Sequence, residues 1–223
     1  MKTHSLLQRS VAEFMGSLFL LAAVVGSGIM GERLAAGNVA LALLANSVAT
    51  GAALVAIILA IAPISGAHIN PVVTLADAWQ GGIAWGETAA YIPAQLAGAF
   101  AGVAATHLMF SLPLFSASTH VRSGAAQCFS EFVATFGLLA VMWGCARRRP
   151  SMVAFAVGAY ITGAYWFTAS TSFANPAVTL ARCVTNTFAG IRPSDTVNFI
   201  VAQFAGAFAA TFLFRWLIPS ENG

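Results

Sequence analysis

Two short segments of the chain are nearly copies of each other, and both are too short to cross a bilayer. They run from Asn70 to Ala76 and from Asn175 to Ala181, with the sequences NPVVTLA and NPAVTLA. Each lies in an otherwise apolar part of the chain. A polar Asn-Pro pair that opens a short helix at membrane depth, and does so twice, is typical of a pore built from half-helices.

The composition indicates a membrane protein. Of the 223 residues, 59% are hydrophobic and 8% are charged, whereas soluble domains carry about 25% charged residues. A core cannot absorb that much apolar surface in a chain of this size, so lipid must cover the rest. The net charge of +3 rests on too few side chains to form a nucleic-acid patch. The scattered Cys128, Cys145 and Cys183 predict neither a disulfide framework nor a metal site, and we expect no cofactor.

A membrane span needs about 20 mainly apolar residues, and the sequence predicts six such spans. Their approximate ranges are 10–31, 39–62, 88–110, 127–146, 151–170 and 196–218. The leftover apolar segments 70–79 and 175–185 are too short to span, so we expect them to be re-entrant. Lys2 and Arg9 ahead of an apolar run resemble a signal peptide. We nevertheless expect the first span to be retained, because it belongs to an internal repeat.

Basic residues predict the orientation, because positive charge gathers on the cytoplasmic side of a membrane. Lys2 and Arg9 precede the first predicted span, Arg147–Arg149 follows the fourth, and Arg215 is near the end of the sixth. With six spans, all of these residues fall on one side. We therefore expect a multi-pass protein of the inner (plasma) membrane with both termini in the cytoplasm.

Three sequence blocks recur in the same order in both halves of the chain. The blocks are AEF and SEF at 12–14 and 130–132, the two Asn-Pro segments, and AQLAGAFA and AQFAGAFA at 94–101 and 202–209. Each half, about 10–110 and 127–218, holds three predicted spans, and an odd number inverts the second half relative to the first. The sequence thus predicts one channel domain over 1–223, whose short segments enter from opposite faces and meet near the midplane.

The Asn-Pro pairs predict where the short helices begin. Asn is a strong N-cap and Pro is favoured at the first helical position, so Asn70-Pro71 and Asn175-Pro176 each open a helix sharply. The positive dipole ends and free backbone N–H groups then point to the meeting place. A water or polyol hydroxyl there would meet donors from both sides, whereas a cation would be repelled. Two capped helices in a soluble core are the alternative, and the inverted repeat of an apolar chain argues against it.

With these motifs, the chain resembles the major intrinsic protein family of aquaporins and aquaglyceroporins over essentially its whole length. The most specific segments are SGAHINP at Ser65–Pro71 and NPA at Asn175–Ala177. The resemblance implies an all-α transmembrane fold, an aquaporin-like six-helix bundle with two re-entrant half-helices. It also implies a homotetramer with one pore per subunit. Half-helix dipoles are already known to exclude cations from aquaporin pores.

Two departures from the family pattern bear on the pore. Val72 stands where the first motif usually has Ala, at the contact of the half-helices. The family usually places Arg three positions after the second Asn, and this chain has Val178 there. Carried over by spacing, the other filter positions are Thr50, Gly163 and Ser172. Because this set is small and uncharged, the resemblance predicts a wide pore.

Four further polar residues are candidates for roles near the pore. Glu13 and Glu131 are costly in lipid, and the resemblance implies that each accepts hydrogen bonds from a re-entrant loop; an interfacial position is the alternative for Glu13. His68 either lines the inner mouth and responds to pH or anchors the loop, and we favour anchoring. Arg182 lies four residues after Val178 on the same helix face. It either adds positive charge to the outer vestibule or snorkels to the membrane interface.

The sequence therefore predicts a passive channel for small uncharged polar solutes: glycerol-like polyols, neutral metalloid acids such as arsenous acid (arsenite), and water. The replacement of Arg by Val resembles bacterial aquaglyceroporins linked to arsenic resistance. A water-selective aquaporin, an ion-coupled secondary transporter and a structural protein with a vestigial pore remain as alternatives. We expect no enzyme activity, because the sequence shows no catalytic triad, phosphate loop or metal-spaced cluster.

Overall fold

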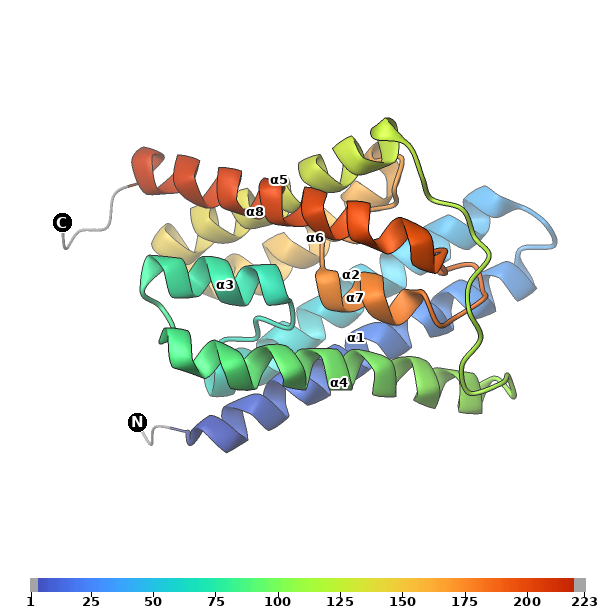
Figure 1. The fold of residues 1–223 in the computed structure, drawn as a ribbon, viewed down its shortest axis with the longest axis horizontal. Coiled ribbons are helices and arrows are strands. Elements are labelled where there is room, and N and C mark those ends of the chain that lie inside the picture. Colours follow the sequence, from blue (N-terminus) through green and yellow to red (C-terminus); the bar gives the residue numbers. More distant parts are fainter. Residues whose placement is uncertain (1–3, 219–223) are drawn as a thin grey trace.

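Six long helices surround two short ones in the computed structural model, which describes residues 4–218 (Figure 1). The long helices are α1 (Leu6–Leu34), α2 (Val39–Ser65), α4 (Trp85–Met109), α5 (Ala125–Arg148), α6 (Val153–Phe167) and α8 (Thr196–Leu217). The short helices are α3 (Pro71–Gln80) and α7 (Pro176–Arg182), and single 3-10 turns, η1 (Pro150–Met152) and η2 (Pro193–Asp195), precede α6 and α8. The fold is the predicted all-helical bundle with two half-helices.

Helix α1 extends beyond the predicted span 10–31 at both ends, whereas α6 and α7 are shorter than predicted. Among the described residues, five helices are long and apolar enough to cross a membrane. Helix α6 has 15 residues, a length of about 22 Å, and η1 extends it at its start. It ends at Phe167 rather than at position 170, and α7 ends at Arg182 rather than at position 185. Both predicted ranges were too long because residues 168–170 and 183–185 contain no Gly or Pro that would mark the end of a helix.

The two halves of the chain are built from matching helix pairs. Helix α4 packs closely on α1 where Gly98 faces the backbone of Phe14, and α8 packs on α5 where Gly206 faces the backbone of Phe132. The halves meet where α2 and α6 cross at Gly51, which faces the backbone carbonyl of α6. Small residues at such crossings let membrane helices approach closely, so the repeated AQ(L/F)AGAFA block has a packing reason.

The start of α1 and the end of α8 lie at the same end of the bundle, as an even number of crossings requires (Figure 1). The half-helices lie end to end between the long helices: α3 runs from the middle toward that end, and α7 runs from the middle toward the opposite end. Their asparagine-capped starts therefore face each other in the middle of the bundle.

Candidate functional site

Each half-helix begins with an asparagine that caps its own backbone. The Asn70 Oδ1 atom accepts a hydrogen bond from the Val72 N–H at 3.2 Å. The Asn175 Oδ1 atom accepts from the Ala177 and Val178 N–H groups at 2.9 Å and 3.3 Å. Proline occupies the first helical position in both cases. The Asn-Pro pair thus fixes where each half-helix starts.

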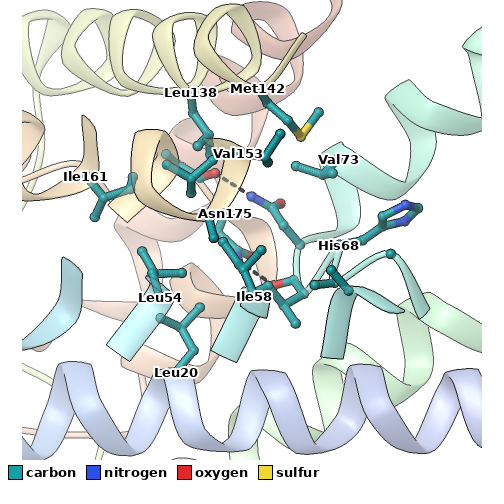
Figure 2. Close-up of a pocket in the computed structure, with 18 of the residues that line it drawn as sticks. Leu20, Leu54, Ile58, His68, Val73, Leu138, Met142, Val153, Ile161 and Asn175 are labelled. Carbon is teal, nitrogen blue, oxygen red and sulfur yellow. Dashed lines mark hydrogen bonds between the residues drawn. The ribbon is translucent and has the colours of Figure 1, made fainter. Parts of the chain in front are cut away.

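The same asparagines join the two halves of the chain. The Asn70 amide donates to the Ala174 carbonyl and the Asn175 amide donates to the Ile69 carbonyl, each at 2.8 Å. An asparagine amide carries two N–H donors, so each amide has a second one to offer. Both asparagines border one cavity, and Figure 2 shows Asn175 among its walls.

That cavity has a volume of about 550 Å³ and runs past both asparagines. At the end toward which α3 runs it is lined by Asp77 and Ala146, and at the end toward which α7 runs by Thr50 and Arg182. Its apolar wall comes from several long helices and includes Leu20, Leu54, Ile58, Leu138 and Ile161 (Figure 2). Apolar side chains on one side thus face asparagine amides and loop backbone on the other.

The loops ahead of the half-helices border the cavity with strained backbone. Ala67, Ile69, Ser172 and Ala174 have φ angles of 52°, 43°, 51° and 48°. A positive φ is uncommon outside glycine and is an outlier for a β-branched residue such as Ile69. Such conformations persist only where the surroundings hold them, so these loops need specific anchors.

Glu13 anchors the first loop from α1. Its carboxylate is fully buried and accepts from the backbone N–H groups of His68 and Ile69 at 2.9 Å and 2.5 Å. The Ser65 hydroxyl and the Gln95 amide each donate to it at 2.7 Å. Glu13 therefore lies inside the bundle rather than at an interfacial surface.

Glu131 makes the equivalent contacts in the second half. It accepts from the backbone N–H groups of Phe173 and Ala174 at 2.9 Å each, and from the Gln203 amide at 2.6 Å. The Gln203 amide also donates to the Thr179 hydroxyl at 2.8 Å. A buried carboxylate stabilises two backbone donors of the strained loop in each half.

The His68 ring is held by several neighbours while it also borders the cavity (Figure 2). Its Nδ1 atom lies 3.2 Å from the Thr74 hydroxyl, and its Nε2 atom lies 3.4 Å from an Asp77 carboxylate oxygen. The ring packs edge-on against Tyr91. His68 therefore both borders the cavity and anchors the loop, which the sequence analysis gave as alternatives.

Three of the four filter residues expected from spacing line the cavity, and Gly163 does not. Thr50, Ser172 and Val178 border it, whereas Gly163 is exposed and a Cβ atom built there would meet nothing within 4 Å. The helix places Tyr165 on the cavity wall instead. Gly163 precedes Tyr165 by two residues, which correspond to about 200° around the helix. Gly163 therefore faces away from the cavity.

Tyr165 lines the cavity and was not among the filter residues expected from spacing. Its hydroxyl donates to the Thr50 hydroxyl at 3.3 Å, which joins α6 to α2 beside the cavity. The signal in the sequence was the periodicity of α6, because Ala154, Val157, Ile161 and Tyr165 recur every three or four residues and share a face. This end of the cavity thus carries an aromatic side chain where a glycine was expected.

We expect Tyr165→Ala and Gly163→Leu to separate the two assignments. The tyrosine variant should raise the permeability to a polyol larger than glycerol, such as erythritol, several-fold, because a side chain leaves the cavity wall. The glycine variant should leave that permeability unchanged. Light scattering of proteoliposomes measures the erythritol permeability of both variants. If only Gly163→Leu changes it, by lowering it, Gly163 lines the pore and Tyr165 does not.

Two buried arginines lie close to the Thr50 end of the cavity. The Arg182 side chain is 2% exposed, its Cζ lies 3.4 Å from the Phe173 ring centroid, and its Nε donates to the Ala189 carbonyl. It does not snorkel to a lipid interface. Arg122, from the loop between α4 and α5, also lies over Phe173 at 5.1 Å and donates to the Gly190 carbonyl at 2.9 Å. Burial lowers the pKa of Arg122 to about 10, which leaves it charged at neutral pH.

Comparison with known proteins agrees with this geometry. The Major intrinsic protein family model matches residues 1–153 and 148–223. The chain belongs to the major intrinsic protein family and is a multi-pass membrane channel for small neutral solutes. Among residues 4–218, no three His, Cys, Asp or Glu side chains come together where they could hold a metal ion.

Relatives and one solved structure resemble nearly the whole chain. Aquaglyceroporin AqpS of Rhizobium meliloti (strain 1021) is 53% identical over 218 residues, which cover 98% of this chain and 93% of that protein. Aquaporin NIP1-4 of Oryza sativa subsp. japonica is 32% identical, over 95% of this chain and 77% of that protein. The aquaglyceroporin of Plasmodium falciparum matches with a TM-score of 0.71 and 20% identity, over 96% of this chain and 98% of that one.

Proposed function

We propose that glycerol-sized polyols, water and neutral metalloid acids such as arsenous acid pass down their gradients through this cavity. One observation carries the proposal: both asparagine amides and the starts of both half-helices converge on a single cavity of about 550 Å³. The likeness to an aquaglyceroporin at 53% identity supports polyols as well as water. The transport is passive and involves no enzymatic step.

The two walls of the cavity suit a molecule with hydroxyls on one side and carbon on the other. The Asn70 and Asn175 amides offer donors, and the apolar wall that includes Leu54 and Ile58 offers contacts to carbon. Positive helix ends in the middle oppose cations. Glu13 and Glu131 are fully buried and bound to loop donors, so they are poor candidates for the ion site of a coupled transporter.

We place the narrowest polar region at the Thr50 end of the cavity, with Ser172 and Val178 as expected and Tyr165 in place of Gly163. The predicted filter, which has Gly163 in place of Tyr165, is wide because all four side chains are small. The aromatic ring of Tyr165 makes the filter narrower, although the other three side chains are smaller than an aromatic ring. This composition fits glycerol-sized solutes better than larger ones.

We further propose a homotetramer in the inner (plasma) membrane, with both ends of the chain in the cytoplasm. Basic side chains at the end of the bundle where α1 begins support this orientation. Arg9 contacts Glu87 at 2.8 Å there, and Arg147 donates to the Phe214 carbonyl at 3.0 Å. Positive charge in short segments next to spans favours the cytoplasmic side.

Stopped-flow light scattering of proteoliposomes tests the proposed function, with sucrose, glycerol and arsenite gradients run side by side. We expect fast water efflux under sucrose, followed by fast re-swelling under glycerol and arsenite, relative to protein-free liposomes. Fast water efflux without re-swelling would identify a water-selective channel. Transport that requires an ion gradient would identify a coupled transporter, and no transport at all would contradict the channel proposal.

A further inference from the structure

The outer end of the cavity has a cation, although the usual filter position lacks one. Val178 occupies the position where the family usually has arginine, and Arg182 follows it by one turn on the same face of α7. Four residues correspond to about 6 Å of rise. Both Val178 and Arg182 line the same cavity, so the positive charge lies farther along one continuous wall.

The Arg182 guanidinium is held in place with most of its donors free. Its flat face lies over the Phe173 ring, and its Nε donates to the Ala189 carbonyl. Of the five N–H donors of a guanidinium, that bond uses one. Within residues 4–218 the two terminal nitrogens have no hydrogen-bond partner, and the side chain borders the cavity. Among the described residues neither nitrogen is a buried polar atom that lacks a partner, so both are open to the cavity, where water or solute can accept their hydrogen bonds.

The charge of Arg182 is not neutralised by a neighbouring carboxylate. Among the described residues, no Asp or Glu lies within ion-pair distance of it. Nearby Glu131 accepts from the Phe173 and Ala174 N–H groups, and Asp195 pairs with Arg192 at 2.8 Å. A cation without an ion-pair partner acts more strongly on other charges at a partly buried site than it would in bulk water.

We propose that Arg182 is the specificity-determining cation of the outer constriction, one helical turn beyond its usual place. Its terminal N–H groups donate to the oxygen atoms of a passing polyol or oxyacid in the cavity that Thr50 and Tyr165 also line. Its charge keeps out cations, including hydrated protons. Phe173 and Ala189 act as positioning groups. The inference rests on the proposed function, since it takes the cavity as the conduction path.

Arg182→Gln, Arg182→Lys and the double variant Val178→Arg/Arg182→Gln test the assignment in proteoliposomes. A trapped pH dye reports proton flux driven by a potassium diffusion potential, and light scattering reports glycerol and water permeability. We expect Arg182→Gln to raise proton flux by about tenfold or more, equivalent to about 1.4 kcal/mol. Arg182→Lys should keep the proton barrier and lower the ratio of glycerol to water permeability a few-fold. The double variant should restore the proton barrier.

Arg33→Gln is the matched control, because it removes a positive charge from an exposed side chain in the last turn of α1 that does not line the cavity. We expect wild-type fluxes from it. A folded Arg182→Gln variant with wild-type proton flux would overturn the role of Arg182, whereas a wild-type protein that passes no solute would overturn the channel proposal. If Arg182→Gln does not fold, Arg182→Lys decides, and an unchanged glycerol-to-water ratio overturns the inference.

Discussion

Glu131→Ala is expected to prevent the chain from forming a stable channel. The change leaves the Phe173 and Ala174 N–H groups and the Gln203 amide without their buried acceptor. Each buried donor left without a partner costs about 1–3 kcal/mol, so the two backbone N–H groups cost about 2–6 kcal/mol, while the Gln203 amide keeps its bond to Thr179. That is a large part of the free energy of unfolding of a typical domain, about 5–15 kcal/mol.

Backbone strain makes this loss more severe. Ala174 has a φ angle of 48°, and its N–H bond to Glu131 is one of the contacts that hold it there. Its carbonyl also accepts the Asn70 amide. Relaxation of the second loop would therefore release a contact between the two halves of the chain, so the defect would spread to the first half-helix.

Detergent-purified variants give the measurement, as the monodisperse fraction on gel filtration and the midpoint of thermal unfolding. Glu131→Gln keeps one carbonyl oxygen as an acceptor and should be intermediate. Glu32→Gln is the matched control, because Glu32 is exposed near the end of α1. A Glu131→Ala protein with the yield and midpoint of the Glu32→Gln control would show that the loop does not need the carboxylate.

The sequence predicted those parts of the pore that local chemistry and repetition determine. Asn is favoured at the N-cap and Pro at the first helical position. The two Asn-Pro pairs therefore predicted the first residue of each half-helix. The recurrence of Glu13 as Glu131 favoured buried acceptors over an interfacial position for Glu13. Their partners, the loop N–H groups, came from the resemblance to the major intrinsic protein family.

The side chains at the Thr50 end of the cavity could not be predicted in the same way. Counting back from Asn175 to α6 crosses a loop in which Thr171, Ser172 and Ala174 all have positive φ. No propensity predicts such a path for non-glycine residues, so the spacing carried over from the family could not show that Tyr165, and not Gly163, borders the cavity. The position of Arg182 depends on the Ala189 carbonyl, which arrives through a later loop. Such a contact between segments is not encoded in the pattern of α7.

Gly98→Ala is expected to lower glycerol permeability, although Gly98 lies at a helix crossing and does not line the cavity. A Cβ atom at Gly98 would lie 2.1 Å from the Phe14 carbonyl oxygen and 2.9 Å from its carbonyl carbon. Both are backbone atoms, so α1 and α4 must separate, and overpacking of this kind costs about 1–3 kcal/mol.

The separation of α1 from α4 affects the loop beside the cavity, because Phe14 directly follows Glu13 in α1. Moving that turn draws the carboxylate away from the His68 and Ile69 N–H groups. We therefore expect a lower thermal midpoint and a several-fold loss of glycerol permeability in proteoliposomes. Gly86→Ala is the control in the same helix, since a Cβ there meets nothing within 4 Å; it should be neutral or stabilise by up to about 1 kcal/mol. Equal midpoints and fluxes for the two variants would mean that the close crossing of α1 and α4 does not hold Glu13 in place.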